Sequence, residues 1–129
     1  MIISKVKRAI SKGNFSTLKP YVDAKERIIW DICGPSDGDP LKHSYDETTA
    51  IILKKLTASN VAVSNEADVY LWNSKENSYM VHIHTEGWAE EYPYMTFLFK
   101  FLQNEQKWKW YGVCYDRVSP SVNKKVLGI

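Results

Sequence analysis

The sequence predicts an α+β fold, in which helices near the N-terminus cover one face of an antiparallel sheet. Helical periodicity occurs only before residue 59, whereas residues 61–118 contain four long runs rich in aromatic and β-branched side chains. The last two runs are separated by the polar segment 104–106, which has the length of a hairpin loop. Helices followed by a meander of strands are typical of the α+β class.

Two helices are expected, at residues 2–12 and 45–58. In the first, apolar residues alternate with lysine and arginine at helical spacing, and Gly13 suits the position that follows a helix end. Ser44 is the expected N-cap of the second helix, and Glu47 completes a capping box. The apolar stripe expected for the second helix consists of Ala50, Ile51, Leu53 and Leu56.

The rest of the chain is expected to form strands and connections. A short helical turn follows Asn14, and Pro20 limits its length. Glycine, proline and aspartate make residues 34–40 a loop. Strands are expected at 27–32, 61–72, 78–88, 93–103 and 107–118. We therefore expect a single domain at residues 1–118 and a C-terminal tail at 119–129.

Neither face of this sheet is cleanly polar. In the run 93–103, Met95, Phe97, Phe99 and Phe101 alternate with Tyr94, Thr96 and Leu98. A sheet that is apolar on both sides has to be covered on both sides. The helices cover one face in this interpretation, and a second subunit is a candidate for the other.

Composition and charge narrow the function classes. The 129 residues are 44% hydrophobic and 25% charged, which is ordinary for a soluble globular protein. Residues 1–27 carry seven basic and two acidic side chains, whereas residues 28–103 carry five and eleven. No nucleic-acid-binding motif, secretion signal or membrane-length apolar segment accompanies this pattern. Two cysteines far apart favour a reducing compartment, so we expect a cytoplasmic protein without nucleic-acid or membrane partners.

The order of elements resembles the nuclear-transport-factor-2-like superfamily, which includes ketosteroid isomerase, scytalone dehydratase and SnoaL-like cyclases. The resemblance rests on two segments: residues 13–18 between the first two helical segments, and residues 106–113 of the Trp-bearing final strand. It implies a cystatin-like cone in which the helices pack in the concave face of a curved sheet. It also implies a pocket at the wide end of the cone and a homodimer through the outer sheet face.

Three sets of side chains are candidates for chemistry. Asp116 and His84 are the candidate catalytic bases, with a tyrosine hydroxyl as oxyanion donor. His82, His84 and Glu86 form one row and contain the residue types of a zinc or iron site, although a polar outer row is the favoured interpretation. We therefore expect neither a metal nor a cofactor.

The abundance of rings suggests a binding cavity, although a ring-rich core is the simpler alternative. The candidate ligand-binding residues are Trp30, Tyr70, His82, Tyr94, Trp108, Trp110 and Cys114. The first functional hypothesis is a protein that binds an apolar or aromatic small molecule. A cofactor-independent isomerase, dehydratase or cyclase and a dimeric interaction module are the alternatives.

Overall fold

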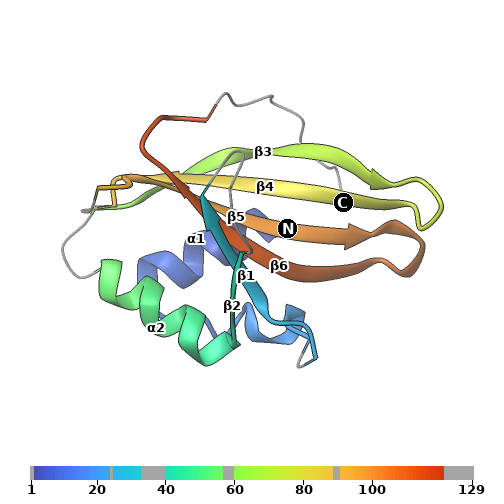
Figure 1. The fold of residues 1–129 in the computed structure, drawn as a ribbon, viewed down its shortest axis with the longest axis horizontal. Coiled ribbons are helices and arrows are strands. Elements are labelled where there is room, and N and C mark those ends of the chain that lie inside the picture. The colour runs from blue at the N-terminus through green and yellow to red at the C-terminus, as the bar shows by residue number, and fades with distance from the viewer. Residues whose placement is uncertain (1, 24, 33–39, 57–59, 89–90, 121–129) are drawn as a thin grey trace.

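A six-stranded sheet and two α-helices form the fold (Figure 1). The computed structural model describes residues 2–23, 25–32, 40–56, 60–88 and 91–120. The helical elements are α1 (Ile2–Lys12), η1 (Lys19–Tyr21), α2 (Tyr45–Leu56) and η2 (Gln103–Glu105). The strands are β1 (Ile28–Ile32), β2 (Leu41–His43), β3 (Ala62–Asn73), β4 (Ser78–Glu86), β5 (Tyr94–Leu102) and β6 (Lys107–Asp116).

The helix ends follow the signals in the sequence. Gly13 has a φ of +61° after α1, and the Asn14 N–H donates to the Ala9 carbonyl at 3.1 Å. The Ser44 hydroxyl accepts the Glu47 N–H at 3.2 Å and so caps α2. The predicted starts of both helices are confirmed, whereas residues 57–59 of the predicted second helix lie outside the described residues.

The predicted apolar stripe of α2 is confirmed only in part. Ile51 and Leu56 are partly buried against the core, whereas Ala50 and Leu53 are exposed. The buried residues of this helix are Thr48 and Ile52. The polar Thr48 can face the core because its hydroxyl accepts the Trp30 indole N–H at 3.4 Å. This hydrogen bond gives both buried polar groups a partner.

The sheet has the order β2-β1-β6-β5-β4-β3. The predicted meander from β3 to β6 is confirmed, and all its pairs are antiparallel. The short β2 was not predicted, nor was the parallel pairing of β1 with β6. Gly112 permits that pairing, because a Cβ at this position would lie 2.9 Å from the Ile29 carbonyl oxygen.

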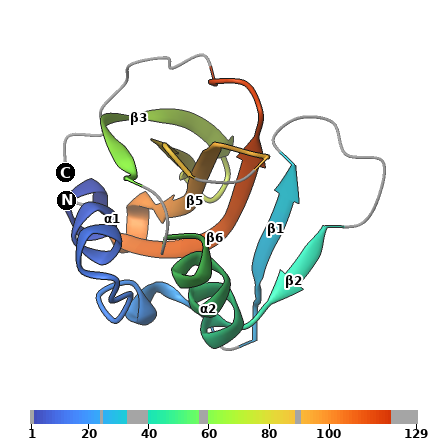
Figure 2. The same ribbon diagram turned by 90° about the vertical axis from the view of Figure 1, so that its left-hand side faces the viewer.

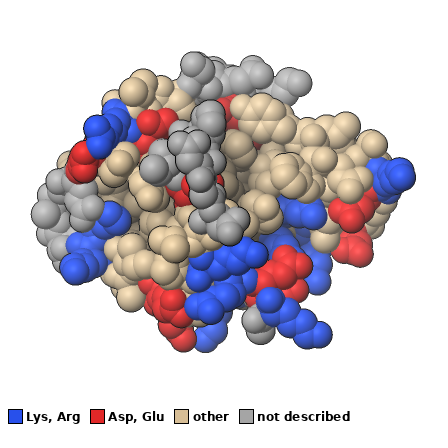
Figure 3. All heavy atoms as spheres, viewed as in Figure 1, with Lys and Arg blue, Asp and Glu red and all other residues tan. Residues whose placement is uncertain are grey.

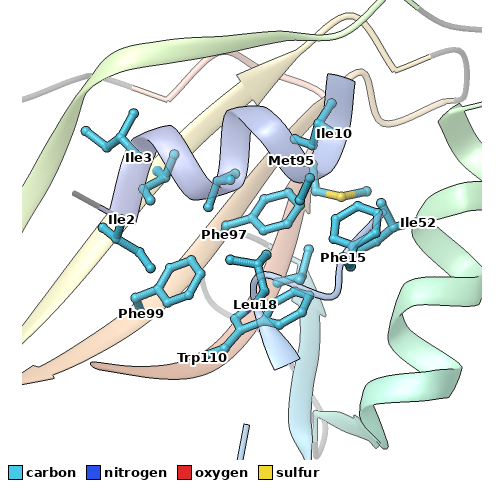
Figure 4. Packing of buried hydrophobic residues seen from close by; sticks show 14 of the residues in the cluster. Ile2, Ile3, Ile10, Phe15, Leu18, Ile52, Met95, Phe97, Phe99 and Trp110 are labelled. Atoms are coloured by element: carbon cyan, nitrogen blue, oxygen red, sulfur yellow. The ribbon is translucent and has the colours of Figure 1, made fainter. Parts of the chain in front are cut away.

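The sheet curves around the helices, and the face toward them is called the helix face (Figure 2). Phe97 and Phe99 of β5 are fully buried there beside the apolar side of α1 (Figure 4). Trp110 stacks on both rings, with centroids 5.8 and 6.1 Å away, and Phe15 packs 6.4 Å from it. The helix face is therefore an aromatic core held together by α1, α2 and β5.

A bulge in β6 divides the row of side chains that alternation predicted. Leu98 pairs with Gly112 but Phe99 pairs with Trp110, so one residue of β6, Tyr111, is left over. Trp108 and Trp110 consequently share the helix face with Phe99. Cys114 and Asp116 lie on the opposite, outer face, where they pair with Thr96 and Tyr94. Strict period-two alternation along residues 108–116 would place these four residues in one row, but the bulge puts them on two faces.

Candidate ligand site beside His84

Both histidines of the His-x-His segment lie on the outer face of the sheet. Ile83 between them is fully buried on the helix face with Ala67 and Phe97 as its strand neighbours. Alternation along β4 then directs His82 and His84 away from the helices. The pair therefore does not line the space between sheet and helices.

His84 is held by a hydrogen bond on each ring nitrogen. Its Nε2 lies 2.8 Å from Asp68 Oδ2 on β3, and its Nδ1 lies 2.8 Å from the Thr96 hydroxyl on β5. The three residues come from three adjacent strands, and each is at least nine-tenths buried. His84 thus has one fixed orientation, because rotation of the ring would break both bonds.

Asp68 is the unusual member of this network. It is 1% exposed, and its Oδ1 is a buried oxygen without a hydrogen-bond partner in the described part of the chain. Burying a carboxylate costs several kcal/mol, and only a good partner offsets that cost. A hydrophobic residue at position 68 would avoid the cost, so the network points to a role other than stability.

The pKa values of His82 and Tyr70, which lie beside this network, are shifted from their ordinary values. Burial, followed by the charge of His84, lowers the pKa of His82 to about 4, and Asp68 opposes this shift. Burial and then the negative charge of Asp68 raise the pKa of Tyr70. The two rings are in contact, with centroids 5.1 Å apart. His82 is therefore neutral at physiological pH.

An open pocket of about 230 Å³ lies beside His84, where β4 ends and β5 begins. Its wall combines apolar and polar groups, and Ser119 and Pro120 close one side after β6. The lining residues are Ala62, Val63, Ser64, His84, Thr85, Glu86, Tyr94, Ser119 and Pro120. This volume is below the roughly 300–1,000 Å³ of pockets for drug-sized ligands, so the pocket suits a smaller molecule.

The candidate residues from the sequence are distributed over both faces. His84 and Tyr94 meet in the pocket beside His84. Trp30, Trp108 and Trp110 belong to the helix face, where Trp30 and Trp110 are buried in the core. Tyr70 and His82 lie together on the outer face, away from the lining of this pocket.

Asp116 and Cys114 have structural partners on the outer face. The Oδ1 of Asp116 accepts the Val118 N–H at 3.1 Å, beyond the end of β6. Cys114 is disulfide-bonded and is absent from the lining of the pocket beside His84. The other cysteine of the chain, Cys33, lies outside the described residues.

Sequence reasoning missed Asp68 and Thr96. One signal was available in the sequence: the charged residue Asp68 lies between Ala67 and Val69 in a predicted strand. Its connection to Thr96 through His84 could not be predicted, because it depends on the register of three strands. Among the described ranges, no three histidine, cysteine or acidic side chains form a group that would hold a metal ion. Within the same ranges, every helix is too short or too polar to cross a membrane.

Comparisons with known proteins identify the fold. No protein-family model matches the sequence, and no curated protein is similar to it. A solved structure of an NTF2-like protein of unknown function from Shewanella baltica OS155 is 15% identical, with a TM-score of 0.57 over 93% of this chain and 90% of that one. A cystatin-like domain from Nostoc punctiforme PCC 73102 is 13% identical, with a TM-score of 0.55 over 92% and 76%.

A third structure, a ketosteroid isomerase-like protein from Shewanella frigidimarina NCIMB 400, is 12% identical, with a TM-score of 0.51 over 89% of this chain and 91% of that one. The chain has the nuclear-transport-factor-2-like fold. At these identities the likeness concerns the fold alone. The nuclear-transport-factor-2-like fold accounts for the curved sheet around the helices, and it assigns no ligand or reaction to the pocket beside His84.

Proposed function

We propose that this protein binds a small molecule that combines an apolar ring with a hydrogen-bond donor. The observation that supports the proposal is the pocket beside His84. Val63 and Pro120 offer apolar contact, whereas Glu86 and the Tyr94 hydroxyl offer polar partners. The hydrogen bonds from Asp68 and Thr96 fix the His84 wall before a ligand arrives, and such preorganisation reduces the entropy lost on binding.

Binding has better support than proton transfer. Both nitrogens of His84 are already engaged, so a base role would first require the loss of one of two hydrogen bonds. Asp116 accepts a backbone N–H and is absent from the lining of the pocket. An isomerase, dehydratase or cyclase therefore stays the second hypothesis for this pocket.

A fragment screen by ligand-observed NMR tests the binding proposal. The fragments are phenol, indole, benzylamine and benzamidine, and the matched variants are Glu86→Gln and the control Glu105→Gln on η2. We expect the cationic fragments to bind, Glu86→Gln to raise their Kd at least fivefold, and Glu105→Gln to change it less than twofold. Equal binding by both variants, or no binding by any fragment at millimolar concentration, would contradict the proposal.

We propose self-association through the outer face as a second function. The observation that favours it is a ring-rich surface, the outer ring patch, formed by Tyr70, Trp72, Leu98 and Tyr111. Tyr70 is 43% exposed and Trp72 is 54% exposed. Seen as in Figure 1, the surface over β3 and β4 carries few charges away from the hairpin tip (Figure 3). Exposed apolar patches of this kind are typical of protein interfaces.

Light scattering after gel filtration tests the second proposal. We expect a dimer for the wild type and a monomer for Tyr70→Glu/Trp72→Glu. The control Leu53→Glu alters an exposed apolar residue on α2, and it should leave the dimer intact. A wild-type monomer at 100 µM would contradict this proposal without affecting the pocket beside His84.

A further inference from the structure

The N-terminal region of the chain carries an unbroken run of positive charge. Residues 1–22 contain five basic side chains, and the first acidic residue is Asp23. Four of the five are exposed, on α1 and η1, and we call them the basic strip: Lys5, Arg8, Lys12 and Lys19. The fifth, Lys7, is partly buried and donates to the Asn65 side chain.

The side chains of the basic strip lack the acidic partners that many other basic side chains of this protein have. Among the described residues, carboxylates pair with Arg27, Lys100, Lys109 and Arg117. Within that same part of the chain, none pairs with a member of the basic strip. Lys5 instead lies over the ring of Tyr21, and Lys19 lies over the ring of Tyr45. Single unpaired lysines also occur elsewhere among the described residues, whereas α1 and η1 together hold four basic side chains of this kind without an intervening acid.

The arrangement along α1 is regular. Lys5, Arg8 and Lys12 follow at intervals of three and four residues, so they share one solvent-facing side of the helix. Seven residues of helix rise by about 10 Å, which sets the length of this row. The apolar side of the same helix is buried in the core, so α1 has no free hydrophobic face to insert into a membrane.

Helix stability accounts for only part of this charge pattern. Lys12 lies in the last turn of α1, where a basic residue stabilises the helix, but the first turn contains no acidic residue and Lys5 lies near the positive end of the helix dipole. Acidic residues there would stabilise the helix by about 0.3–1 kcal/mol each, whereas basic residues act in the opposite direction. A requirement other than folding therefore accounts better for Lys5.

We propose that the basic strip is a docking surface for a short acidic segment of a partner protein. Beyond α1 the charges are mixed, because Lys19 shares a hollow with Arg27 and with four acidic residues, Asp23, Glu26, Asp46 and Glu47. A long polyanion such as a nucleic acid strand would meet these carboxylates, whereas a segment of a few acidic residues fits within the row of about 10 Å. Charge complementarity and footprint both favour the peptide.

Fluorescence anisotropy with a labelled tetra-glutamate peptide, whose length matches the row, tests the proposal. The charge-reversed variant is Lys5→Glu/Arg8→Glu/Lys12→Glu. The control variant Lys42→Glu/Lys75→Glu/Lys107→Glu makes the same change in net charge at exposed lysines outside the basic strip. In 50 mM NaCl we expect the first variant to raise the peptide Kd at least tenfold and the control to raise it less than threefold. Circular dichroism verifies that both variants fold.

Three outcomes would overturn the proposal. Equal weakening by both variants would show that net charge alone attracts the peptide. Tighter binding of a ten-nucleotide thymidine strand than of the peptide, lost in the same charge-reversed variant, would assign the strip to nucleic acid. No binding of either probe at 50 mM NaCl would leave the basic strip as a solvated surface.

Discussion

On the helix face of the sheet, Phe97, Phe99 and Trp110 are buried by stacking on one another and on α1. On the outer face, Asp68, His84 and Thr96 are equally buried, but each needs the hydrogen bonds of the others. The first arrangement tolerates small displacements, because apolar contact has no preferred direction. The second depends on direction and charge. We therefore expect pH, a ligand or a single substitution to have its most specific effects on the outer face.

Truncating the helix face should produce the largest loss of stability. Trp110→Ala removes a ring that contacts Phe15, Phe97 and Phe99, and it leaves a cavity in the core. We expect the free energy of unfolding to decrease by about 3–5 kcal/mol. Urea unfolding followed by circular dichroism measures it. A decrease below about 1 kcal/mol would mean that the rings on this face are not packed as described.

Removing one member of the outer-face network should cost about 3 kcal/mol, because it leaves a buried partner unsatisfied. Asp68→Leu deprives His84 Nε2 of its partner. The double variant Asp68→Leu/His84→Met replaces both groups with apolar side chains of similar size. We expect the double variant to be more stable than Asp68→Leu in the same urea experiment, an outcome with no parallel on the helix face. Additive losses would show that the two side chains are not coupled.

This contrast also explains which features the sequence could predict. Local signals determined the end of α1 and the start of α2, where Gly13, Ser44 and Glu47 act within a few residues. The four-strand meander followed from residue composition. The sequence could not predict which face of the sheet Trp110 occupies, because the bulge that turns it toward Phe99 depends on pairing between strands.

For the same reason, only part of the candidate site could be predicted from the sequence. The sequence identified His84 and Tyr94 as functional candidates, and the structure brings both to one pocket. Asp68 is 16 residues from His84 in the chain, and only the register of β3 on β4 makes them neighbours. The Thr48–Trp30 hydrogen bond, which gives the buried Thr48 hydroxyl a partner, is a long-range contact of the same kind.

The pH dependence of stability should be specific to the outer face. The pKa of His82 is about 4 in the folded chain, whereas a solvated histidine has a pKa of 6.5, so the unfolded chain binds more protons between these values. The free energy of unfolding therefore decreases as pH falls from 6.5 toward 4. With allowance for partial exposure, we expect a decrease of about 2 kcal/mol by about pH 4.5.

The variant His82→Gln isolates this contribution. Asp68, His84 and Tyr70 also face this position and are present in both proteins, so the difference between wild type and variant is the informative quantity. We expect the stability of the wild type relative to the variant to decrease as pH is lowered from 7 to 4.5. Parallel curves over this range would mean that His82 is as accessible to protons in the folded chain as in the unfolded one.

The smallest effect on stability is expected at the outer ring patch. Trp72 contacts Tyr111 at 6.1 Å between ring centroids, but half of its surface faces solvent. Trp72→Ser should change the free energy of unfolding of the monomer by less than about 0.5 kcal/mol, as is typical of surface substitutions. Urea unfolding at 1 µM and at 100 µM measures the change in the monomer and in any dimer. A loss confined to the higher concentration would show that this ring serves association, whereas an equal loss at both concentrations would make it part of the fold.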